Sequence, residues 1–302
     1  MFLATDAVVV GLRALTFVAL FQATGTAIFS FLFGGGLSGP SATRVRKLAR
    51  VSALIGLALN VSYYVLTPAR FAGSFGGAFD PGLQRLLLDS SAGFANIVRI
   101  VGLATLAASL GTGGRGSRVF AAAGIGLALA SFVLMGHTSI HAWRWLLAPL
   151  LLVHLVVAAA WFGALVPLCW IAREEPVETS GALISRFSAL AARTVPAIFV
   201  CGLVMAAVLL GGFAQLLTPY GAMIIVKTVG FAVLMALAVV NKWRYGPAIA
   251  ARAEGAVRRF VRTVAAEAVL IVAILMTTAV MTSLFAPARL HEPSSQQHSD
   301  HR

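Results

Sequence analysis

The sequence predicts an all-α polytopic membrane protein, a bundle of eight transmembrane helices with both termini on the periplasmic side. Of its 302 residues, 59% are hydrophobic and only 11% are charged, too few charges for the surface of a soluble domain. Apolar windows of about 20 residues, the length that crosses a hydrocarbon core of about 30 Å, recur along nearly the whole chain. These runs are continuous rather than alternating, which favours helices over a β-barrel.

Glycine-rich pieces and polar loops separate the apolar runs. GGGLSG follows the first run, GTGGRGS follows the third, and EEPVE follows the fifth. The first run is too long for a signal-peptide core and lacks a basic flank before it, so we expect a helix there. Residues 1–290 are predicted to form one integral-membrane domain, and the polar stretch 291–302 a disordered periplasmic tail. The predicted spans are 7–33, 48–67, 84–109, 118–136, 146–171, 187–212, 219–241 and 262–285.

The formal net charge of +13 is concentrated in alternate connections, those after the first, third and seventh predicted helices. By the positive-inside rule these connections face the cytoplasm, which places both termini outside and leaves the basic loops to meet anionic lipid. This distribution argues against a nucleic-acid partner. The basic residues concerned are Arg44, Arg46, Lys47, Arg50, Arg115, Arg118, Lys242, Arg244, Arg252, Arg258, Arg259 and Arg262.

The two cysteines, Cys169 and Cys201, fall in predicted helices at different depths. That placement disfavours a disulfide, and we interpret both thiols as core residues. The chain has no nucleotide-binding glycine motif and no catalytic triad in an exposed setting, so the sequence does not predict an enzyme.

Three of the six histidines crowd around the connection between the fourth and fifth spans, which faces outside in this orientation. His137 and His141 have the i, i+4 spacing that suits one metal ion if the helix continues past Gly136. His154 lies on the order of 13 Å deeper than Trp145, where an ionisable side chain is a functional candidate. The alternative is that His154 bridges helices by hydrogen bonds and the other two are headgroup-level loop residues.

Five methionines map to the outer half or the middle of their helices: Met135, Met205, Met223, Met276 and Met281. Thioethers together with imidazoles suit copper, especially Cu(I), better than magnesium or calcium. We therefore expect a copper ion, Cu(I) or Cu(II), as the bound metal. Packing is the commoner role for methionine, so these five are weaker candidates than the histidines.

Several polar side chains interrupt the apolar runs. Arg99 and Glu267 are both expected in the inner half, where they could pair, and Lys227 nearer the outside. One interpretation is that such residues lock helix packing, and the other is that Arg99, Lys227, Asn241 and Glu267 form a polar path for an ion or a proton.

Four segments from His154 onward resemble, in order, the copper resistance protein D family. They are HLVVAAAWFGALVPL, RFSALAARTVPAIFVCGLVMAAVLLGG, YGAMIIVKTVGFAVLMALAVVNKWR and RRFVRTVAAEAVLIVAILMTTAVMTS. The family-like part covers residues 146–285, and MGHTSIH is similar to a histidine-bearing segment of the family.

The resemblance implies a bacterial inner-membrane protein of eight helices that moves copper from the periplasm toward the cytoplasm and receives it from a periplasmic copper-binding protein of the CopC type. His141 is supported by spacing alone, and Trp161 is expected to wall the metal site. Two alternatives stay open: a b-type haem redox protein, and a non-transporting membrane dock for a periplasmic copper chaperone. The family-like positions are His137, His154, Trp161, Lys227, Asn241 and Glu267.

Overall fold

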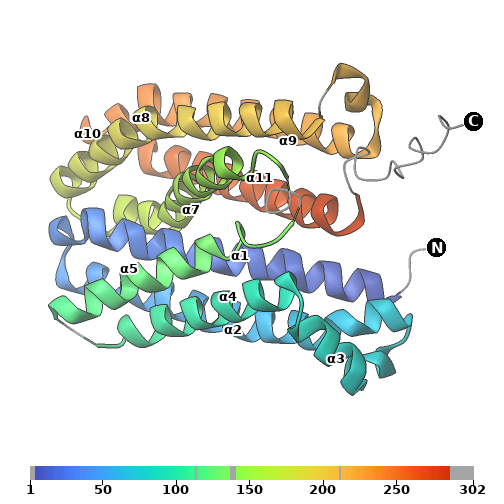
Figure 1. The fold of residues 1–302 in the computed structure, drawn as a ribbon. Helices are drawn as coiled ribbons and strands as arrows, with labels where there is room; N and C mark the ends of the chain where they lie inside the picture. Colours follow the sequence, from blue (N-terminus) through green and yellow to red (C-terminus); the bar gives the residue numbers. More distant parts are fainter. Residues whose placement is uncertain (1–3, 113, 137–140, 211, 286–302) are drawn as a thin grey trace, which may run out of the picture.

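The computed structural model describes residues 4–112, 114–136, 141–210 and 212–285, and within these ranges all regular structure is helical. Long helices run side by side along one direction (Figure 1). The predicted all-α, polytopic architecture is confirmed.

The first half of the chain forms one side of the bundle. α1 packs along α2, and α4 packs against both α2 and α5 (Figure 1). Polar capping residues set the starts of α2 and α3: Ser38 and Asp80 accept hydrogen bonds from backbone N–H groups, and each helix has a proline in its first turn. The elements are α1 (Ala4–Phe33), η1 (Gly34–Gly36), α2 (Gly39–Ala72), η2 (Phe75–Phe79), α3 (Pro81–Leu88), α4 (Ser91–Ser109) and α5 (Arg115–Ala130).

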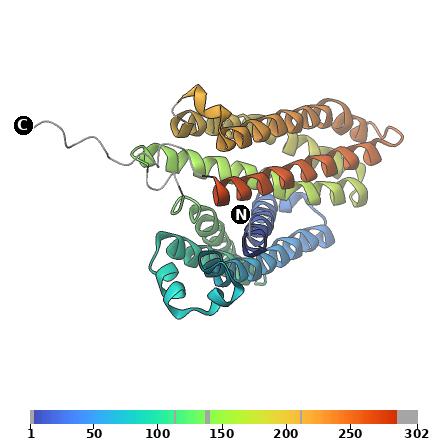
Figure 2. The ribbon, with the colours of Figure 1, turned by 90° about the vertical axis from the view of Figure 1, so that its right-hand side faces the viewer.

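The second half forms the other side. α7 and α11 lie next to α1, whereas α8 and α9 lie farther out, as the rotated view shows (Figure 2). The five residues that follow α9 form a π-helical turn, η4, which leads into the short helix α10. The elements are α7 (Arg144–Glu174), α8 (Val177–Leu210), η3 (Phe213–Leu217), α9 (Pro219–Val240), η4 (Asn241–Tyr245), α10 (Gly246–Ala250) and α11 (Ala256–Leu284).

The contact between α1 and α7 joins the two halves at a close crossing, where a glycine on each helix lets the two backbones touch. A Cβ atom built on Gly25 would lie 1.7 Å from the carbonyl oxygen of Ala159, and one built on Gly163 would lie 2.3 Å from the carbonyl carbon of Gly25. Thr26 donates a hydrogen bond of 2.8 Å to the carbonyl oxygen of Gly163 across the same crossing. Small residues let transmembrane helices approach this closely.

Seven helical segments in the described ranges are long and apolar enough to cross a membrane. The remaining predicted span, 118–136, corresponds to α5, which has 16 residues and ends at Ala130. At 1.5 Å per residue, α5 is about 24 Å long, less than the hydrocarbon thickness of about 30 Å. After Ala130 the backbone changes to tighter i to i−3 hydrogen bonds, from Phe132 to Leu129 and from Val133 to Ala130.

Other predicted boundaries also shift. The predicted span 84–109 consists of two helices, α3 and α4, because Ser90 caps a new helix by accepting a hydrogen bond from the N–H of Gly93. α8 begins at Val177 rather than at residue 187, directly after Pro176. Hydropathy finds the part of a helix that fits in lipid, and polar residues extend the helix beyond it.

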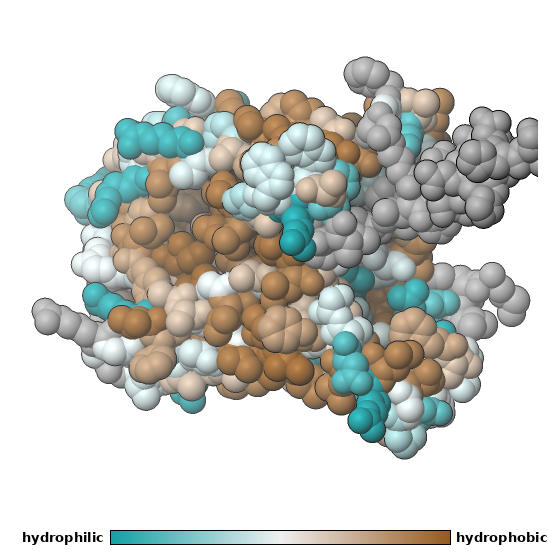
Figure 3. All heavy atoms as spheres, in the orientation of Figure 1, coloured by the Kyte–Doolittle hydropathy of each residue, from teal (hydrophilic) through white to brown (hydrophobic). Residues whose placement is uncertain are grey.

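The first turns of α1 and the last turn of α11 lie at the same end of the bundle (Figure 1). Arg13 of α1 donates a 3.1 Å hydrogen bond to the hydroxyl of Ser283 in α11. Hydrophobic residues cover much of the face in Figure 3, and hydrophilic residues lie mainly toward its two ends. We call the end with the α1 start the outer end and the opposite one the inner end.

Candidate functional site

Of the three histidines expected to capture a metal ion, His137 lies outside the described residues. His141 lies in the turn before α7, where its Nδ1 accepts a 3.1 Å hydrogen bond from the N–H of Trp143. His154 is ten residues beyond the start of α7, about 15 Å along the helix axis. The structure does not gather these two rings: no group of three or more His, Cys, Asp or Glu side chains suited to a metal ion occurs in the described ranges.

The ring of His154 faces α8. Its Nδ1 lies 3.0 Å from the carbonyl oxygen of Ile198, and because a carbonyl only accepts, Nδ1 carries the proton. The lone pair of Nε2 is then available to a ligand. Histidines that bind metals usually donate their other ring N–H to a carboxylate or a backbone carbonyl in this way.

Two sulfur side chains occupy the same face of α8 as the partner of His154. Ile198, Cys201, Gly202 and Met205 follow the i, i+3, i+4, i+7 spacing of one helix face, and the ring of His154 lies against Gly202, 3.7 Å from its ideal Cβ position. Cys201 and Met205 are buried in one cluster with Leu147 of α7. An imidazole, a thiol and a thioether therefore lie along one helix interface.

The sequence alone predicts a core position for Cys201 and Cys169 alike. Both cysteines are free. Only the pairing of His154 with Ile198 reveals that the face with Cys201 opposes the histidine, and the spacing along one chain segment cannot supply that pairing.

The other candidate methionines have different surroundings. Met223 and Met281 pack in a common cluster with Leu210 and Tyr220 near the outer end. Met276 is 42% exposed on α11 and so faces outward. The sulfur of Met135 lies 3.7 Å from a guanidinium nitrogen of Arg99, whose positive charge disfavours a second cation at that sulfur.

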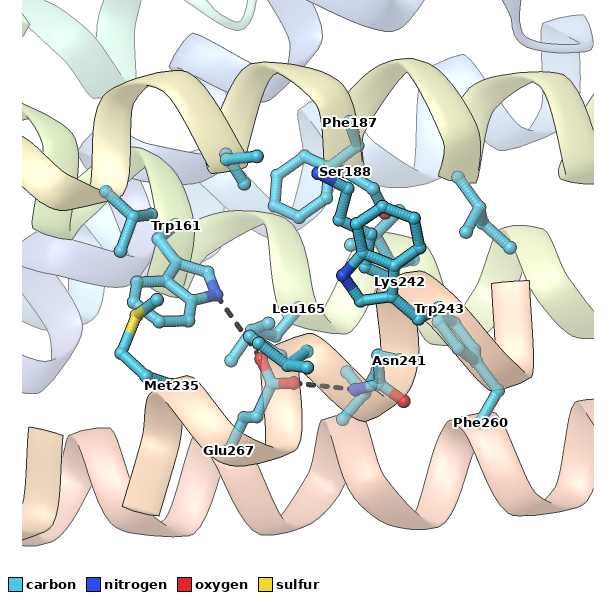
Figure 4. Close-up of a pocket in the computed structure, with 18 residues that line it drawn as sticks. Trp161, Leu165, Phe187, Ser188, Met235, Asn241, Lys242, Trp243, Phe260 and Glu267 are labelled. Carbon is cyan, nitrogen blue, oxygen red and sulfur yellow. Dashed lines mark hydrogen bonds between the residues drawn. The ribbon is translucent and has the colours of Figure 1, made fainter. Parts of the chain in front are cut away.

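A buried carboxyl group lies deeper in the bundle. Glu267 of α11 is 3% exposed. The indole N–H of Trp161 donates to one of its oxygens at 3.3 Å, and the amide of Asn241 donates to the other at 2.6 Å, from opposite sides of the carboxyl group (Figure 4). Thr263 donates to the amide oxygen of Asn241. The ion pairs found among the described residues do not include Glu267.

Glu267, Trp161 and Asn241 line a cavity of about 180 Å³ between α7, α8, α9, η4 and α11 (Figure 4). Its walls are mostly apolar, with Ser188 and Lys242 as further polar groups. The π-helical turn begins at Asn241, and such turns are rare and frequent at functional sites. The expectation that Trp161 lines the metal site stays a prediction. In the structure its hydrogen-bond partner is the carboxyl group of Glu267 rather than a histidine.

The predicted pairing of Arg99 with Glu267 is wrong. Arg99 of α4 donates a 3.0 Å hydrogen bond to the hydroxyl of Ser131, and its guanidinium lies 4.4 Å from the ring centre of Phe132. These partners follow α5 on the outer side, in the other half of the protein. Because α4 begins only at Ser91, Arg99 is about 12 Å from the outer end of its helix rather than in the inner half.

Lys227 lies on α9, partly exposed, and its charge acts on the ring of His154. Fourteen residues of helix, about 21 Å along the axis, separate it from Asn241. The four residues of the expected polar path, Arg99, Lys227, Asn241 and Glu267, thus fall into three places. Only Asn241 and Glu267 are in direct contact.

Two family models match consecutive parts of the chain. The model for the copper resistance protein D-like N-terminal domain matches residues 4–145, and the model for copper resistance protein D matches residues 181–281. Together they cover about four fifths of the sequence.

A curated relative is similar over most of the chain. The copper transport protein CutJ of Bacillus subtilis (strain 168) is 28% identical over 291 residues, which is 91% of this chain and 52% of the relative. The chain therefore spans about half the length of the curated relative it matches. No solved structure matches the chain.

Proposed function

Because the chain belongs to the copper resistance protein D family, we propose that it conducts copper across a bacterial inner membrane, from the periplasmic side toward the cytoplasm. The family descriptions and the printed name of the relative concern copper resistance and copper transport, not catalysis. The chain has no site for ATP hydrolysis that we recognise, so the copper gradient, a proton gradient or handover between partners drives the movement.

The orientation belongs to the proposal. The outer end of the bundle faces the periplasm, α5 forms a short eighth span, and the arginine-rich inner loops contact the cytoplasm and anionic lipid. A periplasmic copper-binding protein of the CopC type delivers the ion to the outer end, and His137 and His141 capture it.

The first binding step takes place at the interface of α7 and α8. Nε2 of His154, the thiol of Cys201 and the thioether of Met205 bind Cu(I) there, because soft sulfur and imidazole donors prefer that ion. The support is the hydrogen bond from Nδ1 of His154 to Ile198, which leaves Nε2 free and fixes the ring against the helix face with both sulfur atoms.

The second step takes place at Glu267. A carboxyl group buried in a membrane-spanning bundle is costly, and here its hydrogen-bond donors are the neutral Trp161 and Asn241. The carboxyl group of Glu267 can therefore bind a cation or a proton beside a cavity of about 180 Å³. This buried carboxyl without a cationic side chain bonded to it is the observation that carries the transport proposal.

Copper uptake by proteoliposomes tests the proposal. With the purified chain, liposomes that contain a copper-sensitive dye are expected to take up Cu(I), and His154→Ala and Glu267→Gln are each expected to lower the initial rate at least about tenfold, which corresponds to about 1.4 kcal/mol in the barrier. Glu254→Gln, which alters an exposed loop acid, is the matched control and keeps the wild-type rate.

The alternatives give different results. A membrane dock for a chaperone binds copper but takes up none, and a b-type cytochrome has a haem absorption band in the purified state. Uptake by the wild-type chain that both variants leave unchanged would contradict the assignment of His154 and Glu267.

A further inference from the structure

Arg99 is a buried cation with neutral partners. It is 2% exposed, and the atoms that its guanidinium contacts are the hydroxyl of Ser131, the sulfur of Met135 and the ring of Phe132. The ion pairs among the described residues do not include it. Arg13, a second guanidinium, is close enough to repel it. A buried charge is costly unless an opposite charge compensates it.

Polar side-chain atoms without hydrogen-bond partners occur on the neighbouring turns of α2 and α4. They are both side-chain polar atoms of Asn60, which is 0% exposed, the hydroxyl of Tyr64 and the amide oxygen of Asn96. Asn96 is one helical turn before Arg99 on the same face of α4. Native proteins satisfy more than nine tenths of such buried groups, so four orphaned atoms on adjacent turns indicate a missing partner.

The packing of α2 against α4 places Asn60 at the level of Arg99. A Cβ built on Gly56 would contact the side chain of Leu103 at 3.6 Å, and the two helices run antiparallel. Asn60, one turn beyond Gly56, then lies level with Arg99, one turn before Leu103. Tyr64 and Asn96, one turn farther out, line a cavity together with Tyr63, Thr67 and Met135.

This cavity measures about 30 Å³, enough for one or two water-sized particles. Met135, whose sulfur contacts Arg99, forms part of its wall, and Leu87 and Ala92 at the junction of α3 and α4 form its outer part. A small ligand thus has space next to the Met135 side chain that contacts Arg99, whereas an organic anion does not fit.

We propose that the side chains around Arg99, namely Asn60, Tyr64, Asn96, Ser131 and Met135, form a binding site for a small inorganic anion such as chloride. The guanidinium compensates the negative charge, and the Tyr64 hydroxyl and Asn60 amide supply donors that a halide accepts. Water alone satisfies the amides but leaves the charge of Arg99 uncompensated, and a copper ion is repelled by it. The site is separate from the proposed copper path, which runs through the other half.

Thermal unfolding of the purified full-length protein in detergent tests this site. At constant ionic strength, replacement of gluconate by chloride is expected to raise the melting temperature by about 3 °C when chloride exceeds its Kd tenfold, and the effect saturates. Arg99→Gln is expected to lose this shift. Arg85→Gln, which removes an exposed arginine of α3, is the matched control and keeps it.

A second measurement covers the case in which Arg99→Gln does not fold. Wild-type crystals soaked in bromide are expected to show an anomalous peak within about 3.5 Å of the Arg99 guanidinium or the Tyr64 hydroxyl. A wild-type melting temperature that is equal in both salts, a shift that survives in Arg99→Gln, or ordered water with no bromide peak would overturn the proposal.

Discussion

The role assigned to Cys201 changes once the neighbours of its side chain are known. In the sequence it is one of two apolar-helix cysteines with no feature that separates it from Cys169. In the structure it lies between Ile198 and Met205 on the helix face that holds the ring of His154. Its position, rather than its chemistry, distinguishes the two thiols.

Substitution of the two cysteines separates a ligand from a core residue. Cys201→Ser is expected to weaken Cu(I) binding at least about tenfold, because a hydroxyl is a poor ligand for a soft ion. Cys169→Ser, the matched change on α7, is expected to leave the affinity unchanged. Competition with a chromophoric Cu(I) chelator measures both. Equal affinities in the two variants would exclude Cys201 from the site.

Among the residues singled out in the sequence, depth was harder to predict than polarity. Arg99, Asn241 and Glu267 were all recognised as intramembrane polar groups, and all are buried. The predicted pairing of Arg99 with Glu267 is wrong. One continuous helix over 84–109 would put Arg99 in the inner half, whereas the chain breaks at Ser90 and a new helix begins there. Composition indicates that a polar group is in the membrane, whereas its partner depends on which helices become neighbours.

The helices themselves show what hydropathy measures. Seven of the eight predicted spans correspond to segments long enough to cross a membrane. The remaining one, α5, ends at Ala130, after which the backbone changes to i to i−3 hydrogen bonds and Ser131 and Phe132 contact Arg99. The predicted span therefore joined a helix and a turn that share an apolar composition, and only tertiary contacts separate them.

The crossing of α1 and α7 depends on the absence of side chains. Gly25→Ala is expected to destabilise the protein by about 1–3 kcal/mol or more, because the new Cβ would lie 1.7 Å from the carbonyl oxygen of Ala159 and the helices must separate. Gly11→Ala, on the same helix with nothing within 4 Å, is the control and is expected to be neutral or slightly stabilising. Thermal unfolding in detergent measures both, and equal losses would show that the crossing tolerates a methyl group.

For the molecule as a whole, the charge distribution and the fold together predict which end of the bundle faces the cytoplasm. The start of α1 and the end of α11 lie at one end, opposite the arginine-rich loops (Figure 1). By the positive-inside rule we expect both termini in the periplasm.

Reporter fusions test this orientation. Alkaline phosphatase fused after residue 285 is expected to be active, because it folds only outside the cytoplasm, and a fluorescent protein at the same point is expected to be dark. A fusion within the loop at Glu254 is expected to give the reverse pattern. An active phosphatase at Glu254 would invert the orientation and with it the proposed direction of copper movement.

The contacts of α1 limit how the chain can be divided into fragments that fold. α1 falls in the segment matched by the N-terminal family model, yet it packs against α7 and α11, which lie beyond that segment. In a fragment that begins at residue 146, Gly163 of α7 would lack the α1 backbone that packs against it. We therefore expect the segments matched by the two family models to fold as one cooperative unit, and a split version to regain its fold only when both pieces are synthesised together.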